Sequence, residues 1–265
     1  MDRIVVTAWT VLLCTVGCGT PTQTPIPLWE HQLVDLTHTF DEHTIFWPTE
    51  SGFEITKRSA GKTDKGYYYE AHSFSTPEHG GTHIDAPVHF FEGRHAVDQI
   101  PLERLIGPGV VVDVSSACSN DRDFRVGVAE FETWERENGP VPKGAIVLLR
   151  TGFGRHWPDR ERYMGTAKRG AEGVAALHFP GLDPDSIPWL AARQISAIGL
   201  DTPSIDHGPS THFEAHVALF ERNIPAMENV ANLDALPAKG FTVIALPMKI
   251  GGGSGGPLRI VAVLP

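Results

Sequence analysis

Three histidines and one aspartate lie within eleven residues, between His79 and His89. His83 and Asp85 are two positions apart, so their side chains point to the same face of an extended segment. His79 lies four residues before His83, and the two glycines that follow His79 allow the chain to fold its imidazole toward the same point. Imidazole and carboxylate groups are ligands suited to zinc or manganese. This spacing predicts a divalent metal site.

His89 is separated from the other three residues by Pro87. Proline cannot continue a central strand, so we expect strand pairing to stop there and a loop to present His89. A single histidine is more often a hydrogen-bonded loop residue than a functional one. The complete pattern His-x3-His-x-Asp-x3-His, bracketed by Gly-Gly and Pro, favours a functional site over that alternative.

The elements that must position these residues alternate between strands and short helices. Continuous apolar runs predict buried strands, and apolar residues at helical spacing predict helices. The expected strands are residues 32–37, 110–114, 145–149, 195–200, 241–248 and 259–264, and the expected helices are 128–137, 185–193 and 210–222. No repeat or internal linker interrupts them, so we expect a single α/β domain with a mixed β-sheet and flanking helices.

Composition narrows the class of protein. The chain has 265 residues, a hydrophobic share of 41% and a net charge of −10, so disorder is excluded and nucleic acid is not expected as a partner. Cys118 is the single cysteine of the body and is expected to be a small core or surface residue. Arg150, at a strand end, is expected to form an internal ion pair. The glycine-rich stretch 251–256 lacks the Lys-Ser/Thr of a phosphate loop and is interpreted as a flexible rim of the active site.

The first residues have the character of an export signal. An apolar run within residues 1–17 is too short to span a bilayer, which favours a signal peptide over a transmembrane helix. Cys18 after Gly17 is similar to a lipoprotein cleavage box, and residues 18–28 are expected to form a tether. We therefore expect an exported protein, periplasmic or anchored to the membrane through a lipid on Cys18, with a functional domain at 29–265.

The segment His79-Gly-Gly-Thr-His-Ile-Asp-Ala-Pro-Val-His-Phe90 resembles the signature of the metal-dependent cyclase-like hydrolases, which include bacterial kynurenine formamidase and isatin hydrolase. Further similar segments are 34–37, Trp47-Pro48, 199–206 and 249–257. The resemblance implies a fold of the swivelling β/β/α type and a homodimer. It also implies two divalent ions per subunit, zinc in the first place and manganese as the alternative.

The resemblance implies a role for each matching residue. His79, His83 and Asp85 would hold the first metal. His216 would bind the second metal, and Asp85 and Glu228 would bridge both ions. His89 would be the general acid/base.

Three of the assignments have alternatives that the residues leave open. His212 and His216 are four apart on one face of the expected helix, so a helix could direct either inward, and His212 could equally be a solvated surface residue. Trp47 either stacks on an aromatic substrate or is packed. Glu228 on its own would be interpreted as a salt-bridge residue, and the resemblance favours the ligand role.

The expected activity is hydrolysis of a carbon–nitrogen amide bond in a small molecule. An arylformamidase-like reaction would convert N-formylkynurenine to kynurenine and formate, as in tryptophan catabolism, and a related reaction would open the lactam of isatin. Two alternatives remain, a dehydratase or cyclase acting on another substrate and a non-catalytic lipoprotein that binds metal or solute. The presence of His89 beside a full ligand set favours catalysis, because a storage site needs no acid/base group.

Overall fold

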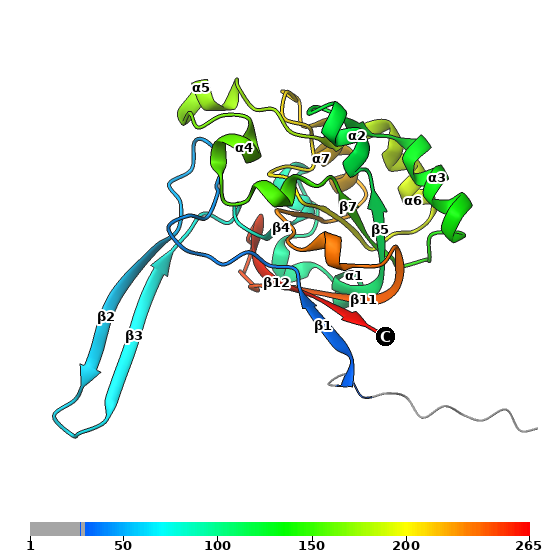
Figure 1. The fold of residues 1–265 in the computed structure, drawn as a ribbon. Coiled ribbons are helices and arrows are strands. Elements are labelled where there is room, and N and C mark those ends of the chain that lie inside the picture. Colours follow the sequence, from blue (N-terminus) through cyan, green and yellow to red (C-terminus); the bar gives the residue numbers. More distant parts are fainter. Residues whose placement is uncertain (1–26, 28–29) are drawn as a thin grey trace, which may run out of the picture.

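The computed structural model describes Pro27 and residues 30–265 (Figure 1). The predicted signal peptide at 1–17 and most of the predicted tether at 18–28 lie outside these residues. No helix in the described part of the chain is long and apolar enough to cross a membrane. The described chain forms one α/β domain around a mixed sheet, as predicted.

Eight strands form the central sheet. In spatial order they are β1 (Gln32–Asp35), β12 (Gly255–Leu264), β11 (Lys239–Pro247), β5 (Ile106–Asp113), β7 (Ile146–Arg150), β9 (Ala197–Leu200), β10 (Ala226–Glu228) and β4 (His83–Asp85). The strands β5, β7, β9 and β10 are parallel neighbours, and the other pairs are antiparallel. The first residues of β12 also pair with β4, so the sheet curls back on itself at the strand that carries the histidine motif.

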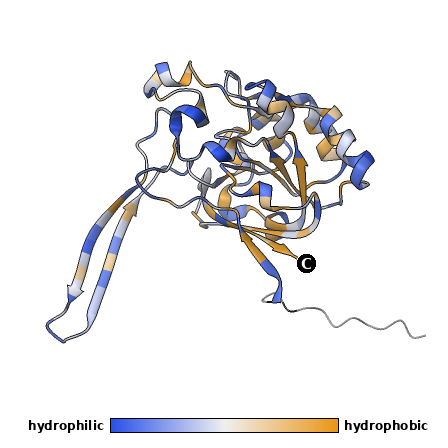
Figure 2. Ribbon diagram, in the orientation of Figure 1, coloured by the Kyte–Doolittle hydropathy of each residue, from blue (hydrophilic) through white to orange (hydrophobic). Residues whose placement is uncertain are grey.

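Helices cover one face of the parallel strands, and the curled sheet encloses a second core (Figure 1). The helices are α1 (Leu102–Leu105), α2 (Ser115–Asn120), α3 (Val128–Asn138), α4 (Arg160–Met164), α5 (Gly170–Val174), α6 (Ile187–Ala192) and α7 (Glu214–Phe220). Because the parallel strands are covered on both faces, their middle residues are apolar and lie at the hydrophobic centre of the molecule (Figure 2), while charged residues stand at their ends. This rigid centre carries the site at its edge.

A long two-stranded hairpin extends away from the body (Figure 1). It consists of β2 (Glu54–Lys62) and β3 (Tyr68–Ser75), and nearly every residue in it is exposed. A second small sheet pairs β6 (Arg125–Val126) with β8 (Gly181–Leu182). Short 3-10 turns lie at 87–89, 97–99, 153–156, 184–186 and 233–235.

The predicted helix at 210–222 is wrong at its start. α7 begins at Glu214, after Phe213, whose backbone adopts a left-handed conformation with φ of 52°. Ser210 accepts a hydrogen bond from the Phe213 backbone N–H and so closes a turn before the helix. The helical face that was expected to carry both His212 and His216 therefore does not exist.

Other expectations hold with smaller changes. The helix at 128–137 is α3, and the predicted strands correspond to β1, β5, β7, β9, β11 and β12 with shifted ends. Cys118 is buried in the core, and Arg150 forms an ion pair of 2.7 Å with Asp113. The stretch at 251–256 is only partly a rim, because β12 begins at Gly255 and pairs with β4.

Candidate metal centre

The short strand β4 carries two of the predicted ligands on one face. His83 and Asp85 are both buried and point to the same side, while Ile84 between them points into the second core. Glu228 lies directly across from His83 on β10, because the two residues are register partners in an antiparallel pair. Strand pairing ends after Asp85, and Pro87 begins the 3-10 turn that holds His89, as predicted.

His79 reaches the same point because glycines stand at two positions close to it, Gly81 and Gly255, where a side chain would clash. At Gly81, with φ of +57°, a Cβ atom would come within 2.6 Å of the Phe40 ring. At Gly255 on β12, a Cβ atom would lie 2.6 Å from Cε1 of His79. Glycine at both positions therefore makes room for the turn and for the imidazole itself.

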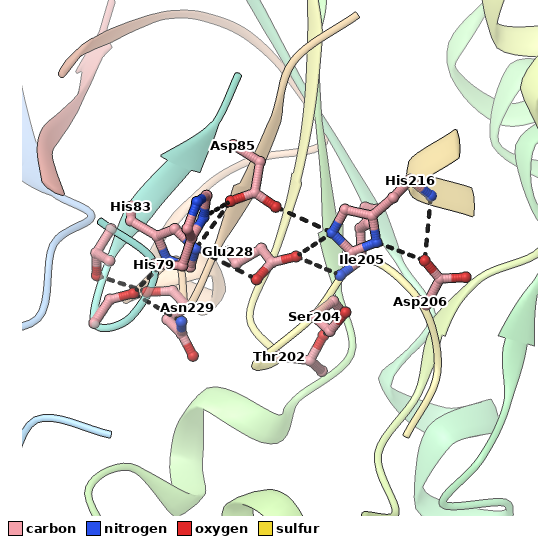
Figure 3. A network of polar contacts seen from close by, with 12 residues as sticks. His79, His83, Asp85, Thr202, Ser204, Ile205, Asp206, His216, Glu228 and Asn229 are labelled. Atoms are coloured by element: carbon pink, nitrogen blue, oxygen red, sulfur yellow. Dashed lines mark hydrogen bonds and ion pairs between the residues drawn. The ribbon is translucent and has the colours of Figure 1, made fainter. Parts of the chain in front are cut away.

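Asp85 lies between the histidines (Figure 3). Its Oδ1 is 2.7 Å from Nδ1 of His79 and 3.1 Å from Nε2 of His83. Its Oδ2 faces the other way and is 3.0 Å from Nε2 of His216, which α7 directs inward. The two oxygens of one carboxylate thus face two separate groups of nitrogen atoms.

Glu228 repeats this arrangement. Its Oε2 is 3.5 Å from Nε2 of His83, and its Oε1 is 3.2 Å from Nε2 of His216. The backbone N–H of Ile205 donates to the same Oε1 at 2.8 Å and fixes the side chain. Both carboxylates therefore span the gap between the two groups of nitrogen atoms, which is the arrangement that two adjacent ions require.

The donor set fits a divalent metal ion. His83, Asp85 and Glu228 place one ligand atom each within 4.8 Å of one another, as do His79, Asp85 and His89. Nε2 of His83 is buried and has no hydrogen-bond partner, which leaves it free to coordinate. In each predicted histidine ligand the nitrogen facing away from the carboxylates is held by another group, as is usual for metal-binding histidines. These contacts are His79 Nε2 to Ser254 Oγ at 2.9 Å, His83 Nδ1 to the Gly81 carbonyl at 2.9 Å, and His216 Nδ1 to Asp206 Oδ2 at 2.6 Å.

The charges at the centre are strongly coupled. Burial alone would lower the pKa of His83, but the adjacent Asp85 and the nearby Glu228 outweigh it and raise that pKa to about 9. Burial and the charge of Asp85 raise the pKa of Glu228. Burial opposes ionisation of Asp85 as well, yet the surrounding histidines hold its pKa well below the usual range. In the metal-free protein, the raised pKa values of His83 and Glu228 favour protons at this centre. These protons offset part of the negative charge that bound cations would otherwise balance.

His89 lies beside this centre and is oriented differently. Its ring stacks on His79 with centroids 3.7 Å apart, and no hydrogen bond to another described side chain fixes its nitrogens. Burial lowers the pKa of His89 to about 4, because the charged form of the ring is disfavoured away from water. The uncharged ring has an unprotonated nitrogen that can accept a hydrogen bond.

A cavity of about 440 Å³ opens over the centre, a size typical of small-molecule sites. Its walls include Trp47, Phe90 and Phe213, and the ring centroids of Phe90 and Phe213 lie 4.9 Å apart. Trp47 is partly buried and packs against the core as well as facing the cavity. Stacking on an aromatic substrate stays a prediction. His212 is exposed and does not line the cavity, so its candidacy is withdrawn.

Several residues of the site were missed by sequence reasoning. Phe213 and Asn229 both have positive φ values and line the cavity, while Asp206 holds a ligand histidine. Phe90 also contributes to the cavity wall. Asp206 and Phe90 had a signal, because they lie in the segments 199–206 and 79–90 that resemble the cyclase-like hydrolases.

Comparison with known proteins agrees with this geometry. Residues 34–207 match the family model described as Putative cyclase, which covers more than half of the chain, so the protein belongs to that family. Isatin hydrolase of Roseibium aggregatum is 33% identical over 80% of this chain and 81% of its own length. Kynurenine formamidase of Salinibacter ruber is 30% identical over 86% of this chain and 96% of its own.

The fold has the same relatives. The solved structure of isatin hydrolase A from Labrenzia aggregata bound to benzyl benzoate has a TM-score of 0.79 and 33% identity, covering 88% of this chain and 93% of that one. The prediction of a hydrolase of the cyclase-like family is therefore confirmed, both for the fold and for the class of enzyme.

Proposed function

We propose that this protein hydrolyses the carbon–nitrogen bond of an aryl amide with two divalent ions. The observation that carries the proposal is the placement of Asp85 and Glu228, each with one oxygen facing each group of histidine nitrogens, beneath an aromatic cavity. The relatives named isatin hydrolase and kynurenine formamidase support the same chemistry.

Zinc is the proposed metal, because buried imidazole and carboxylate groups are its usual nitrogen and oxygen ligands, and manganese is the alternative. His79 and His83 would hold one ion and His216 the other, with both carboxylates shared. Ions held there acidify water toward neutrality and polarise a carbonyl oxygen.

His89 is the proposed acid/base group. Its unconstrained ring faces the centre beside His79 and lines the cavity, so it can take a proton from the attacking water. Hydroxide adds to the carbonyl carbon, the carbon–nitrogen bond breaks, and the proton on His89 passes to the departing nitrogen. The hydroxyl of the water thus ends on the acyl carbon and its proton on the nitrogen, in one ring-opened product for a lactam and in two products for a formamide, and no other reactant is required.

The cavity wall favours a neutral, ring-shaped substrate. Apolar surface dominates it, and none of the described residues that line it is a lysine or arginine. The α-carboxylate of formylkynurenine would therefore find no lysine or arginine partner in this wall, which holds the acidic residues Glu50 and Glu78. We therefore propose an isatin-like aryl lactam as the preferred substrate class, with formamide cleavage as the second candidate because kynurenine formamidases are also relatives.

A metal-loaded activity panel tests this proposal. The zinc-loaded and manganese-loaded protein would be given isatin, formylkynurenine and a simple N-formylaniline, with the released products quantified. Ring opening of isatin with a higher kcat/KM than formylkynurenine is the expected result. No hydrolysis of any amide by either form would contradict the proposal and return attention to a dehydratase or a non-catalytic metal-binding protein.

We also propose that the protein is a homodimer in which the hairpin β2–β3 contacts the second copy. A two-stranded hairpin is marginal on its own in water, yet this one exposes the cross-strand pair Ile55 and Phe74 with 59% and 55% of their surfaces accessible. Light scattering should give a dimer mass for the wild type and a monomer for Ile55→Ser/Phe74→Ser. Leu102→Ser, at an equally exposed position on the body, is the control. A monomeric wild type would refute the proposal.

We also propose that the protein is exported and anchored to the membrane by a lipid on Cys18. The apolar run and the Gly17-Cys18 pair within residues 1–18 support this proposal. Cys18→Ser should move the protein from the membrane fraction to the soluble fraction. An unchanged membrane pool would show that the anchor does not exist.

A further inference from the structure

Asp206 contacts both the start of α7 and the histidine that this helix carries. Its side chain is 3% exposed, and it lies after β9 in the loop that leads to the helix. Oδ1 accepts the backbone N–H of Ala215 at 2.9 Å, and Oδ2 accepts the backbone N–H of His216 at 3.2 Å. The same Oδ2 also accepts the imidazole Nδ1–H of His216 at 2.6 Å (Figure 3).

We propose that Asp206 is a positioning residue for metal binding, an inference that rests on the proposed function of His216 as a ligand. By accepting Nδ1–H, the carboxylate fixes the tautomer of His216 that leaves Nε2 unprotonated and directed at Asp85 and Glu228. By accepting two backbone N–H groups, it also fixes where α7 begins. One carboxylate thus sets both the orientation of the ring and the position of the helix that carries it.

The number of donors explains why a carboxylate is needed. Three N–H groups converge on Asp206, and its two acceptor oxygens satisfy all of them. Asparagine has only one oxygen. If that oxygen stays with Ala215, the amide NH2 faces Nδ1 of His216 and favours the tautomer with Nε2 protonated, which cannot coordinate. If the amide is reversed, its NH2 faces the N–H of Ala215 and the helix start loses its acceptor.

The test compares Asp206→Asn with Asp159→Asn. Asp159 caps α4 by accepting the backbone N–H of Arg162 at 3.1 Å, so its variant controls for the loss of a helix cap away from the metal centre. Competition with a chelator should show zinc binding about 10–100-fold weaker at one of the two ions in Asp206→Asn, the usual loss for such partners. Asp159→Asn should keep wild-type affinity.

A second measurement does not depend on the folding of Asp206→Asn. In the proton NMR spectrum of the zinc-loaded protein, the Nδ1 proton of His216 should give a slowly exchanging downfield signal, assigned by its absence from His216→Ala. Asp206→Asn, where folded, should lack it. Unchanged zinc affinity in Asp206→Asn, or no such signal in the wild type, would overturn the inference. Failure of the wild type to bind zinc would instead refute the proposed function, so the two failures are distinguishable.

Discussion

Asp85 determines the spacing of the candidate centre because its two oxygens face opposite groups of nitrogen atoms. One oxygen is near His79 and His83, and the other is near His216. Its neighbours on the sheet leave little freedom, since β4 is paired on one side with β10 and on the other with β12. At this scale the site is a buried cluster of carboxylates and imidazoles. The negative charge of the carboxylates is balanced only when protons or cations are bound there.

His89→Ala tests the division between ligand and acid/base roles. A ring nitrogen of His89 lies within 4.8 Å of ligand atoms of His79 and Asp85, but His89 stacks on His79 and forms no hydrogen bond with a described carboxylate, so we expect the variant to keep its metal. Turnover should fall by about 10²–10⁴, the scale of one general acid/base group, and the loss should be smaller for an activated ester, whose leaving group needs no proton. Elemental analysis beside steady-state kinetics checks both points; loss of metal together with activity would make His89 a ligand.

The pH dependence of metal binding follows from the raised pKa of two histidines. Carboxylates raise the pKa of His83 to about 9 and that of His216 well above its ordinary value, so both rings are protonated in the metal-free protein at neutral pH. Metal must displace those protons. Zinc affinity should therefore keep rising between about pH 7.5 and pH 8.5, where unperturbed histidines are already largely deprotonated. Chelator competition at several pH values measures this; a plateau above about pH 7 would contradict it.

At the scale of elements, the parallel strands β5, β7 and β9 and the helix α3 could be predicted because apolar runs and helical spacing reflect burial directly. The three-residue strand β10 was not predicted, because it is too short to give an apolar run. The alternation of His83, Ile84 and Asp85 likewise predicted which side chains share a face, and the structure places them so. The hairpin β2–β3 could not be predicted, because neither of its faces is buried within this chain and no apolar alternation marks it. The start of α7 was also missed. The first backbone N–H groups of this helix are capped by Asp206, which lies several residues before it and not at the usual position next to the first turn.

Gly255→Ala tests how β12 contributes to the site. A Cβ atom there would lie 2.6 Å from the His79 ring and the same distance from the Ile84 carbonyl, so the ring must move from its position beside Asp85. We expect weaker binding of the ion held by His79 and reduced turnover. Gly251→Ala is the matched control, because no atom lies within 4 Å of its Cβ position and its φ is not positive. Equal zinc affinity in the two variants would show that the close approach is not needed.

At the scale of the whole molecule, the curled sheet brings together residues that are far apart in the chain. The centre combines the segment 79–89, the helix α7 and the strand β10, and the cavity adds Trp47 from the region before the hairpin. Sequence spacing alone predicted the first segment. His216 and Glu228 required the resemblance to the cyclase-like hydrolases, because nothing local to either residue indicates that the fold places them 3.2 Å apart.

The number of bound ions tests the central claim most directly. Wild-type protein loaded with zinc, freed of excess metal and measured by elemental analysis should hold two ions per chain. His216→Ala should retain one of them, because His79 and His83 remain with both carboxylates. A wild type that holds no zinc, or a His216→Ala protein with the same zinc content as the wild type, would contradict the account of a two-ion centre.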